Sequence, residues 1–259
     1  MDRGFLFGDG VYEVIPVYHG KIFRLTEHLD RLQNSLDSIL ITNPYSHDEW
    51  LTILTKLNSF SPESDQSLYL QITRGADTQR KHNFGTLTPT VYIEANPLIP
   101  KTKAQLEIGF SAMTREDIRW HRCDIKSISL LANILYAQDA KQHQVEEMIL
   151  SRNHEITEGA TSNVFMLKDN TLFTHPTGPN ILSGITRDLV ISSAKACKLD
   201  IQETPFLLDD IQYADGLWIS SSTREIMPIT LLDDQPINQG VIHPAWSCVY
   251  DHYQQLKND

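Results

Sequence analysis

The chain has 259 residues, of which 41% are hydrophobic and 21% charged. This composition is typical of an ordinary globular protein, and the length permits one large domain or two small ones. Its 22 basic and 33 acidic residues give a net charge of -11. A nucleic acid or an anionic membrane would need a basic patch, so the charge disfavours both as partners. No apolar run approaches the length of a membrane span.

Cysteine usage and the N-terminus favour the cytoplasm. The three cysteines are widely spaced, and none belongs to a CxxC pair, so we expect no disulfide framework. They are Cys123, Cys197 and Cys248. The first ten residues lack the basic start and apolar run of a secretory signal.

The N-terminal elements predict a mixed unit of strands and helices. Residues 10–23 predict two strands joined at His19-Gly20, where glycine can take a positive φ. A helix is predicted from Thr26 to Ile39, with an apolar stripe every three or four residues. A second helix begins at Ser46, whose spacing from Glu49 is typical of a capping box. Further strands are predicted over 67–74 and 89–95.

Two prolines and few packing residues in 96–103 indicate a linker. We therefore expect an N-terminal domain over 1–97, a linker over 98–104 and a C-terminal domain over 105–259. The C-terminal domain is predicted to hold a strand near 105–113, an irregular stretch to 126, helices over 129–142, 184–198 and 244–256, and strands within 146–175 and over 216–221 and 226–231. The fold class predicted is α+β, with two domains of mostly antiparallel sheet flanked by helices.

Lys126 is a candidate nucleophile. It lies in Arg-Cys-Asp-Ile-Lys-Ser-Ile-Ser, and an extended segment there would put it on one face with Asp124 and Ile128. A desolvated lysine attacks carbonyl groups readily. A solvated lysine before a helix is the alternative.

Glu158 is a candidate partner for a ring nitrogen. It precedes Gly159 and small residues, which let the backbone approach a ligand closely. A carboxylate there could hold a proton on a pyridine nitrogen, but a turn glutamate between two strands fits the pattern too.

Two segments could bind phosphate. Ser183 to Arg187 opens a helix, where backbone N–H groups such as those of Ile185 and Thr186 face an anion. Ordinary capping by Ser183 explains the same pattern. Hydroxyls after the strand near 216–219 could donate to phosphate oxygens or form a polar loop, and they include Ser221 and Ser222.

Four further residues could meet a ligand. Arg80 and His82 point the same way in an extended chain and could grip a carboxylate. Tyr12 and Tyr69 lie on strands with apolar alternate positions, so Tyr69 faces away from the apolar side; half-buried sheet packing is the alternative. Arg31 falls off its helix's apolar stripe, which predicts solvent, although a phosphate on that flank would meet it as well.

Other signals for chemistry are weak. The chain has no dinucleotide fingerprint, no P-loop and no nucleophile elbow. No pairs at zinc spacing occur, so we expect no metal.

Taken in chain order, several motifs together resemble the class IV (fold type IV) pyridoxal-phosphate aminotransferases, and most closely the bacterial D-amino acid aminotransferases. They are DRGFLFGDGVYE, EHLDRL, YLQITRG followed by RKH, DIRWHRCDIKS, ITEGATSNVF, ILSGITRD and SSSTREIMPI.

The resemblance implies a role for each candidate residue. Lys126 is similar to the Schiff-base lysine and Glu158 to the partner of the pyridine nitrogen of pyridoxal 5'-phosphate. The implied phosphate cup consists of Arg31, the backbone at Ile185 and Thr186, and the hydroxyls of Ser221 and Ser222. The implied site for the substrate carboxylate consists of Tyr12, Arg80 and His82. Tyr69 remains a candidate substrate contact from strand alternation alone. In the family the neighbouring subunit supplies the arginine and histidine of this carboxylate site, so a homodimer is expected.

The implied reaction is transamination between a D-amino acid and a 2-oxo acid. A branched-chain L-aminotransferase, an R-selective amine transaminase and an aminodeoxychorismate lyase are the alternatives of the same fold, and the Arg-x-His pair argues against them. Two departures from the family are present. Ala160 stands where relatives often have serine, and relatives carry one or two strands before Asp2, which this N-terminal domain is expected to lack.

Overall fold

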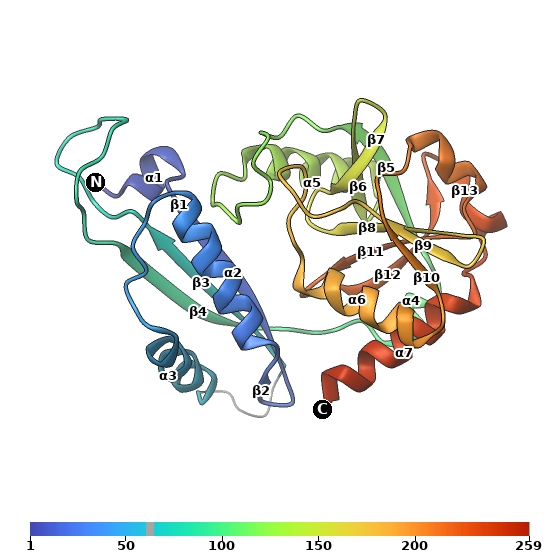
Figure 1. Cartoon of the computed structure of the whole chain (residues 1–259), viewed down its shortest axis with the longest axis horizontal. Coiled ribbons are helices and arrows are strands. Elements are labelled where there is room, and N and C mark those ends of the chain that lie inside the picture. The colour runs from blue at the N-terminus through green and yellow to red at the C-terminus, as the bar shows by residue number, and fades with distance from the viewer. Residues whose placement is uncertain (61–64, 259) are drawn as a thin grey trace. The chain divides into compact units, whose positions relative to one another are not determined.

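The computed structural model describes residues 1–60 and 65–258. These residues form two compact units, drawn in Figure 1. Unit 1 comprises Met1–Ile99 and Ile125–Leu130, and unit 2 comprises Pro100–Asp124 and Leu131–Asp259. The change of unit after Ile99 falls within the predicted linker, whereas the return of Ile125–Leu130 to unit 1 was not predicted.

Unit 1 is built on a four-stranded antiparallel sheet of order β2-β1-β3-β4. The predicted hairpin is present, and both His19 and Gly20 take positive φ values, 51° and 77°. The strands are β1 (Gly10–Tyr18), β2 (Lys21–Ile22), β3 (Gln66–Thr73) and β4 (Thr90–Pro97).

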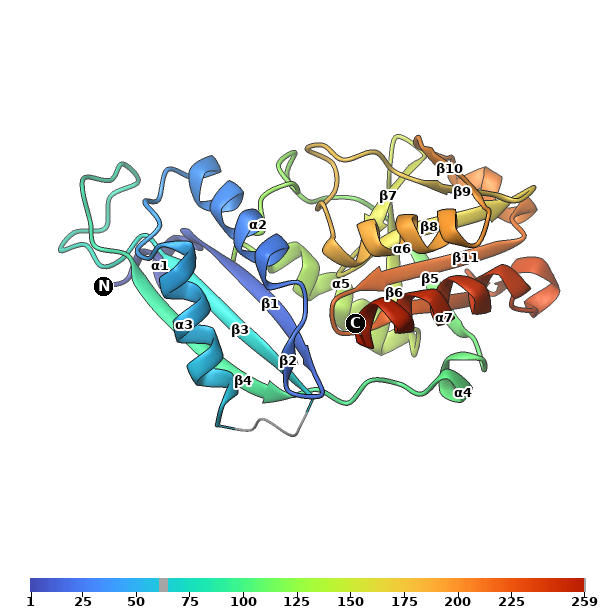
Figure 2. The same cartoon turned by 60° about the horizontal axis from the view of Figure 1, so that its bottom comes forward.

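Two helices of unit 1, α2 (Leu25–Ser38) and α3 (His47–Asn58), pack on its sheet, as Figures 1 and 2 show. Side chains of the helices and of the sheet form the core of the unit. The predicted stripe of α2 is buried at Leu29, Leu32 and Leu36. The capping box predicted for the second helix is formed at the start of α3. A further helix, α1 (Arg3–Phe7), was not predicted; Asp2 caps it, and it ends at Gly8 with a φ of 67°.

The segment Ile125–Leu130 runs along the edge of β1. Tyr12 N–H donates to the Lys126 carbonyl over 3.0 Å, and Ile128 N–H donates to the Gly10 carbonyl over 3.1 Å. Ile125 is buried in the core of unit 1. Because side chains alternate in extended chain, Lys126 faces the other side of the sheet.

Unit 2 contains a nine-stranded mixed sheet of order β10-β9-β8-β11-β12-β5-β6-β7, with β13 paired to β12. Most neighbouring pairs are antiparallel, as predicted. The strands are β5 (Phe110–Glu116), β6 (Glu147–Arg152), β7 (Glu155–Gly159), β8 (Asn163–Lys168), β9 (Thr171–Thr174), β10 (Asp200–Glu203), β11 (Gly216–Ser221), β12 (Glu225–Leu232) and β13 (Gln235–Pro236).

The prediction of a strand from residue 105 is wrong at its start. A short helix, α4 (Lys103–Leu106), comes first, because Thr102 and Gln105 form a capping box. Gly109, with a φ of 78°, then turns the chain into β5.

The other helices of unit 2 are α5 (Leu131–His143), α6 (Ile185–Ala196) and α7 (Pro244–Asn258), with short 3-10 turns η1 (Leu208–Tyr213) and η2 (Ile237–Gly240). α6 and α7 lie side by side (Figures 1 and 2). No helix of the described chain is both long and apolar enough to cross a membrane.

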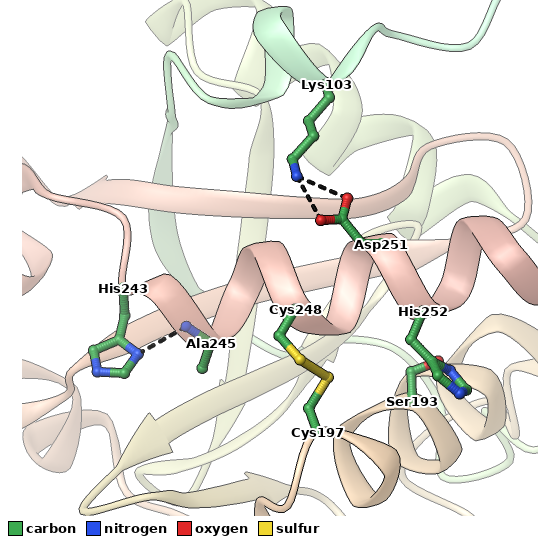
Figure 3. Close-up of a disulfide and its surroundings, with 8 residues drawn as sticks. All are labelled: Lys103, Ser193, Cys197, His243, Ala245, Cys248, Asp251 and His252. Atoms are coloured by element: carbon green, nitrogen blue, oxygen red, sulfur yellow. Dashed lines mark hydrogen bonds and ion pairs between the residues drawn. A yellow bond between two sulfur atoms is a disulfide. The ribbon is translucent and has the colours of Figure 1, made fainter.

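The expectation that no disulfide forms is wrong. Cys197, at the end of α6, is bonded to Cys248 of α7 (Figure 3). The two are 51 residues apart in sequence, and only the packing of α6 on α7 brings their Cα atoms within 6.1 Å. Ser193 and His252 make a second contact between these helices, 3.1 Å from Oγ to Nδ1. Cys123 is free and buried.

Leu36→Ala is expected to destabilise unit 1, because Leu36 is fully buried. Removing such a side chain leaves a cavity and costs about 2–5 kcal/mol. Urea unfolding measures the loss. Leu51→Ala is the matched control on α3, since Leu51 is 45% exposed; an equal loss in both variants would contradict the packing described here.

Candidate active site

The backbone of Lys126 is held on both sides. Its carbonyl accepts from Tyr12 N–H, and its own N–H donates to Ser35 Oγ of α2 over 3.2 Å. Its ammonium nitrogen lies 4.3 Å from the centroid of the Tyr12 ring. Among the described residues this nitrogen has no hydrogen bond or ion pair. Lys126 is therefore fixed in position while its amine stays available for chemistry.

Tyr12 and Tyr69 share one face of the unit 1 sheet. Their rings are stacked with centroids 5.8 Å apart, and Tyr69 Oη donates to Gln71 Oε1 over 2.6 Å. The neighbours of Tyr69 on β3, Leu68 and Leu70, are fully buried on the opposite face, as the alternation predicted. Burial and the neighbouring Tyr12 raise the pKa of Tyr69.

Helix periodicity predicted that Arg31 points to solvent, but the side chain is largely buried. Its Nε and Nη2 each donate over 2.8 Å to the carboxylate of Glu13, and its side chain is only 11% exposed. Burial alone would raise the pKa of Glu13, but the charge and hydrogen bonds of Arg31 hold it well below its usual range. His28 Nδ1 lies 2.7 Å from the same carboxylate.

Sequence reasoning missed Glu13 and His28. A signal for Glu13 was present, because it occupies an alternate position of β1 between Val11 and Ile15, both fully buried. A charge on an apolar face needs a buried partner of opposite charge. That partner is Arg31 of α2.

Arg80 and His82 lie in the exposed loop between β3 and β4. Both contact Phe7 of α1: the Arg80 guanidinium carbon lies 5.0 Å from the ring centroid, and the His82 ring centroid lies 5.5 Å from it. The two side chains that were predicted to act together are therefore gathered on one aromatic ring.

Glu158 is a buried carboxylate near the end of β7 in unit 2. Oε1 accepts from Arg119 Nη1 over 2.5 Å, and Oε2 accepts from Asn163 Nδ2 and Leu182 N–H, each over 3.1 Å. Burial raises the pKa of Glu158 to about 7, although Arg119 opposes the rise. A cation brought to this carboxylate would favour its charged form.

The charge network behind Glu158 was not predicted. Arg119 also donates from Nε and Nη2 to Asp117, over 2.9 Å each, and Arg152 lies 3.2 Å from the same carboxylate. Burial alone would raise the pKa of Asp117, but its bonds with Arg119 lower it. The Asp-x-Arg spacing in 117–119 was visible in the sequence, but only folding shows that both side chains are buried.

The N-terminus of α6 lies next to Glu158 through Asn163. Asn163 Nδ2 also donates to the Leu182 carbonyl over 2.8 Å. A Cβ on Gly184 would lie 2.0 Å from Asn163 Oδ1, so the close approach requires glycine. Gly184, not Ser183, is the N-cap of α6, and no side chain caps it. In the described chain the amides of Ile185 and Thr186 have no hydrogen-bond partner and remain available to an anion.

The hydroxyls after β11 lie beside the same site. Ser220 pairs with Asn163 in the β8–β11 register. Ser220 Oγ is buried and has no hydrogen-bond partner within the described residues. Ser221 Oγ accepts from Arg224 N–H over 3.3 Å. Ser221 and Ser222 are both partly exposed, in keeping with a place at the rim of a binding site.

The family model for amino-transferase class IV matches residues 10–232. The chain belongs to the class IV aminotransferase family. It is 41% identical over 254 residues to a D-alanine aminotransferase of Listeria monocytogenes, which covers 97% of this chain and 88% of that protein. It is 42% identical over 244 residues to a D-alanine aminotransferase of Bacillus licheniformis, over 94% of this chain and 86% of that protein.

Solved structures support the fold. The branched-chain amino acid aminotransferase of Escherichia coli superposes with a TM-score of 0.88 at 26% identity, covering 96% of this chain and 86% of that one. The branched-chain aminotransferase of Thermoproteus uzoniensis gives a TM-score of 0.88 at 23% identity, over 99% and 88% of the two chains. The second likeness concerns the fold alone.

Aminotransferases of this class are pyridoxal-phosphate enzymes, and this chain is one. The residues of unit 2 fit that cofactor on chemical grounds. Glu158 offers a buried carboxylate to a protonated ring nitrogen, and the unpaired amides of Ile185 and Thr186 with the unpartnered Ser220 Oγ offer donors to a phosphate. In unit 1, Lys126 offers an uncommitted amine.

Glu158→Gln is expected to change how stability of the cofactor-free protein varies with pH. The folded-state pKa of Glu158 is raised from 4.5 to about 7, so between these values the unfolded carboxyl loses its proton first and wild-type stability falls as pH rises. Glutamine does not titrate. The free energy of unfolding of the variant relative to wild type therefore increases across this window, on the order of 3 kcal/mol at about 1.4 kcal/mol per pKa unit.

Urea unfolding at a series of pH values between 4.5 and 7.5 measures this difference. Glu155→Gln is the matched control on the same strand, since Glu155 is exposed. A difference between Glu158→Gln and wild type that does not vary with pH would contradict the raised pKa.

Proposed function

We propose that the enzyme transfers an amino group between a D-amino acid (D-alanine, D-glutamate or D-aspartate) and a 2-oxo acid (pyruvate or 2-oxoglutarate). The observation that carries the proposal is the state of Lys126, whose backbone is fixed by Tyr12 and Ser35 while its amine is uncommitted beside the Tyr12 ring. The D-alanine aminotransferases at 41% and 42% identity support the choice of substrate class.

Lys126 is proposed as the covalent attachment point of pyridoxal phosphate and as the base that moves the α-proton of the substrate. A lysine amine placed beside the substrate can take and return a proton. When bound, the cofactor supplies the electron sink that makes the α-proton acidic. Glu158 is proposed to hold a proton on the ring nitrogen, since Arg119, Asn163 and Leu182 orient its carboxylate.

The phosphate is proposed to bind at the N-terminus of α6. Backbone amides at a helix N-terminus and nearby hydroxyls suit an anion, so Ile185, Thr186, Ser221 and Ser222 are assigned to it. Arg31 is proposed as its cationic partner; in the present structure Glu13 engages this guanidinium.

The substrate carboxylate is proposed to bind Arg80 and His82, with Tyr12 and Tyr69 beside it. Arginine and histidine donate charge-assisted hydrogen bonds to a carboxylate. The contact of both side chains with Phe7 supports a joint role. The position of the carboxylate decides which face of the α-carbon meets Lys126, and hence whether D- or L-amino acids react.

The enzyme is proposed to act in the cytoplasm as a homodimer in which Arg80 and His82 serve the neighbouring subunit. α5 presents three apolar side chains to solvent at positions i, i+3 and i+4, on one face: Leu131, Ile134 and Leu135 are 71%, 60% and 55% exposed. Contiguous exposed apolar surface marks interaction sites, and a second copy of this chain is the proposed occupant.

The substrate class is tested by steady-state turnover of D-alanine against L-leucine with 2-oxoglutarate. D-alanine is expected to react at least ten times faster in kcat/KM. Lys126→Ala is expected to abolish both turnover and the visible absorbance of the lysine-bound cofactor. Lys103→Ala is the control, since Lys103 pairs with the exposed side chain of Asp251. Faster turnover of L-leucine would identify a branched-chain aminotransferase instead.

Arg80→Ala is expected to lower kcat/KM for D-amino acids about ten- to a hundredfold while the cofactor absorbance stays intact, because a charge-assisted hydrogen bond contributes roughly 1.5–3 kcal/mol. Arg24→Ala removes another arginine of unit 1, which pairs with the exposed Glu27 and lies over the Phe23 ring; it is the control and should be neutral.

Mixing the inactive Lys126→Ala protein with the weakened Arg80→Ala protein tests the dimer. If Lys126 and Arg80 reach one site from different subunits, each mixed dimer holds one site with both residues intact, and activity returns in part. Mixed dimers shown to form by mass spectrometry, without recovered activity, would place both residues in one subunit.

A further inference from the structure

Arg3 is a buried arginine that the proposed chemistry leaves unused. It lies at the start of α1 and is 3% exposed. Its Nη1 donates to the Lys81 carbonyl over 2.6 Å, and its Nη2 donates to the His82 carbonyl over 3.0 Å. The same guanidinium therefore binds two successive peptide groups of the segment that carries Arg80 and His82.

The loop it binds has few other backbone contacts, although the ring centroid of Phe84 in this loop lies 3.6 Å from the Arg74 guanidinium carbon. Residues 77–89 form no helix or strand, and Arg80, Lys81 and His82 are all exposed. The other backbone contacts lie at its start, where Asp77 N–H donates to the Met1 carbonyl over 3.2 Å. At its middle, Arg3 supplies the hydrogen bonds that fix the peptide direction.

Arg3 is itself held rigidly. Its Nε donates to Asp9 Oδ2 over 2.8 Å, and Arg74 donates to both oxygens of Asp9. Burial alone would raise the pKa of Asp9, but Arg74 and Arg3 lower it, so the carboxylate stays charged. The Arg3 guanidinium carbon also lies 4.8 Å from the Phe7 ring centroid.

Phe7 links this anchor to the side chains. The Arg80 guanidinium and the His82 ring both contact the Phe7 ring, at 5.0 Å and 5.5 Å. α1 thus holds the backbone through Arg3 and the two side chains through Phe7. A cation over an aromatic face is attracted to it, which restricts the rotamers of Arg80.

We propose that Arg3 is a positioning residue for the substrate carboxylate site: it fixes the peptides of Lys81 and His82 so that Arg80 and His82 present their donors together. This inference rests on the proposed role of Arg80 and His82. Lysine is a poor replacement, because one ammonium cannot supply the planar set of donors that serves two carbonyls and a carboxylate.

A double-mutant cycle tests the proposal, using the cofactor-loaded enzyme and the four proteins wild type, Arg3→Gln, Arg80→Ala and the double variant. Arg3→Gln is expected to lower kcat/KM for D-alanine about ten- to a hundredfold, mainly through KM, because misplaced binding groups cost this much. In the Arg80→Ala background the same change is expected to cause a smaller loss of kcat/KM, because one of the two residues through which Arg3 acts is gone and only His82 remains.

Amide hydrogen exchange gives a readout independent of turnover. Exchange in residues 78–85 is expected to be faster in Arg3→Gln than in wild type. Asn58→Ala is the matched control, a buried tether of the same unit whose hydrogen bonds go to Gly20 and Gln66; it should leave this exchange unchanged. If Arg3→Gln does not fold, Arg3→Lys replaces it in the cycle and should show the same pattern.

Two outcomes overturn the inference separately from the proposed function. Equal losses from Arg3→Gln in both backgrounds, or unchanged exchange in 78–85, would show that Arg3 does not act through this loop, although Arg80 could still bind substrate. Wild-type turnover in Arg80→Ala would overturn the carboxylate role itself, and the Arg3 proposal with it.

Discussion

The edge pairing between β1 and Ile125–Leu130 is the constraint on which the position of Lys126 depends. The chain leaves unit 1 after Ile99, builds β5 in unit 2, and returns for six residues before α5 begins. Those residues form backbone hydrogen bonds to Gly10 and Tyr12. Ile125 anchors the segment in the core, and alternation then puts Lys126 on the face of Tyr12. A shift of one residue in this pairing would bury the lysine and expose the isoleucine.

In both units several buried or partly buried carboxylates are held by a guanidinium. Glu13 is bound by Arg31, Asp9 by Arg3 and Arg74, and Glu158 by Arg119. Removing a carboxylate from water is unfavourable unless a cation and hydrogen bonds replace the solvent. The pKa of Glu158 is raised whereas that of Glu13 is lowered. Arg119 is shared between Glu158 and Asp117, so it offsets less of the effect of burial on Glu158. That incomplete compensation suits a carboxylate whose partner is a cationic ligand.

Local patterns predicted the elements that depend on neighbours in sequence. The capping box at Ser46 and Glu49, the turn at His19-Gly20 and the stripe of α2 involve residues at most a few positions apart. Prediction failed where a short local signal was overlooked, as for the capping box of α4. It also failed where the deciding contact was distant. Helix periodicity alone pointed Arg31 to solvent, because its partner Glu13 lies 18 residues away on another element. Cys197 meets Cys248 only through the packing of α6 on α7.

By itself the sequence determined the family, the fold class and the candidate lysine, because motif residues and hydrophobic periods are properties of the chain read in order. Only the tertiary structure decided which charges are buried and which peptides are tied together. Glu158 with Arg119, and Arg3 with the carbonyls of Lys81 and His82, join residues 39, 78 and 79 positions apart. The free energy of such a contact depends on burial and on geometry within a few ångströms, and neither is encoded by the spacing of residues along the chain.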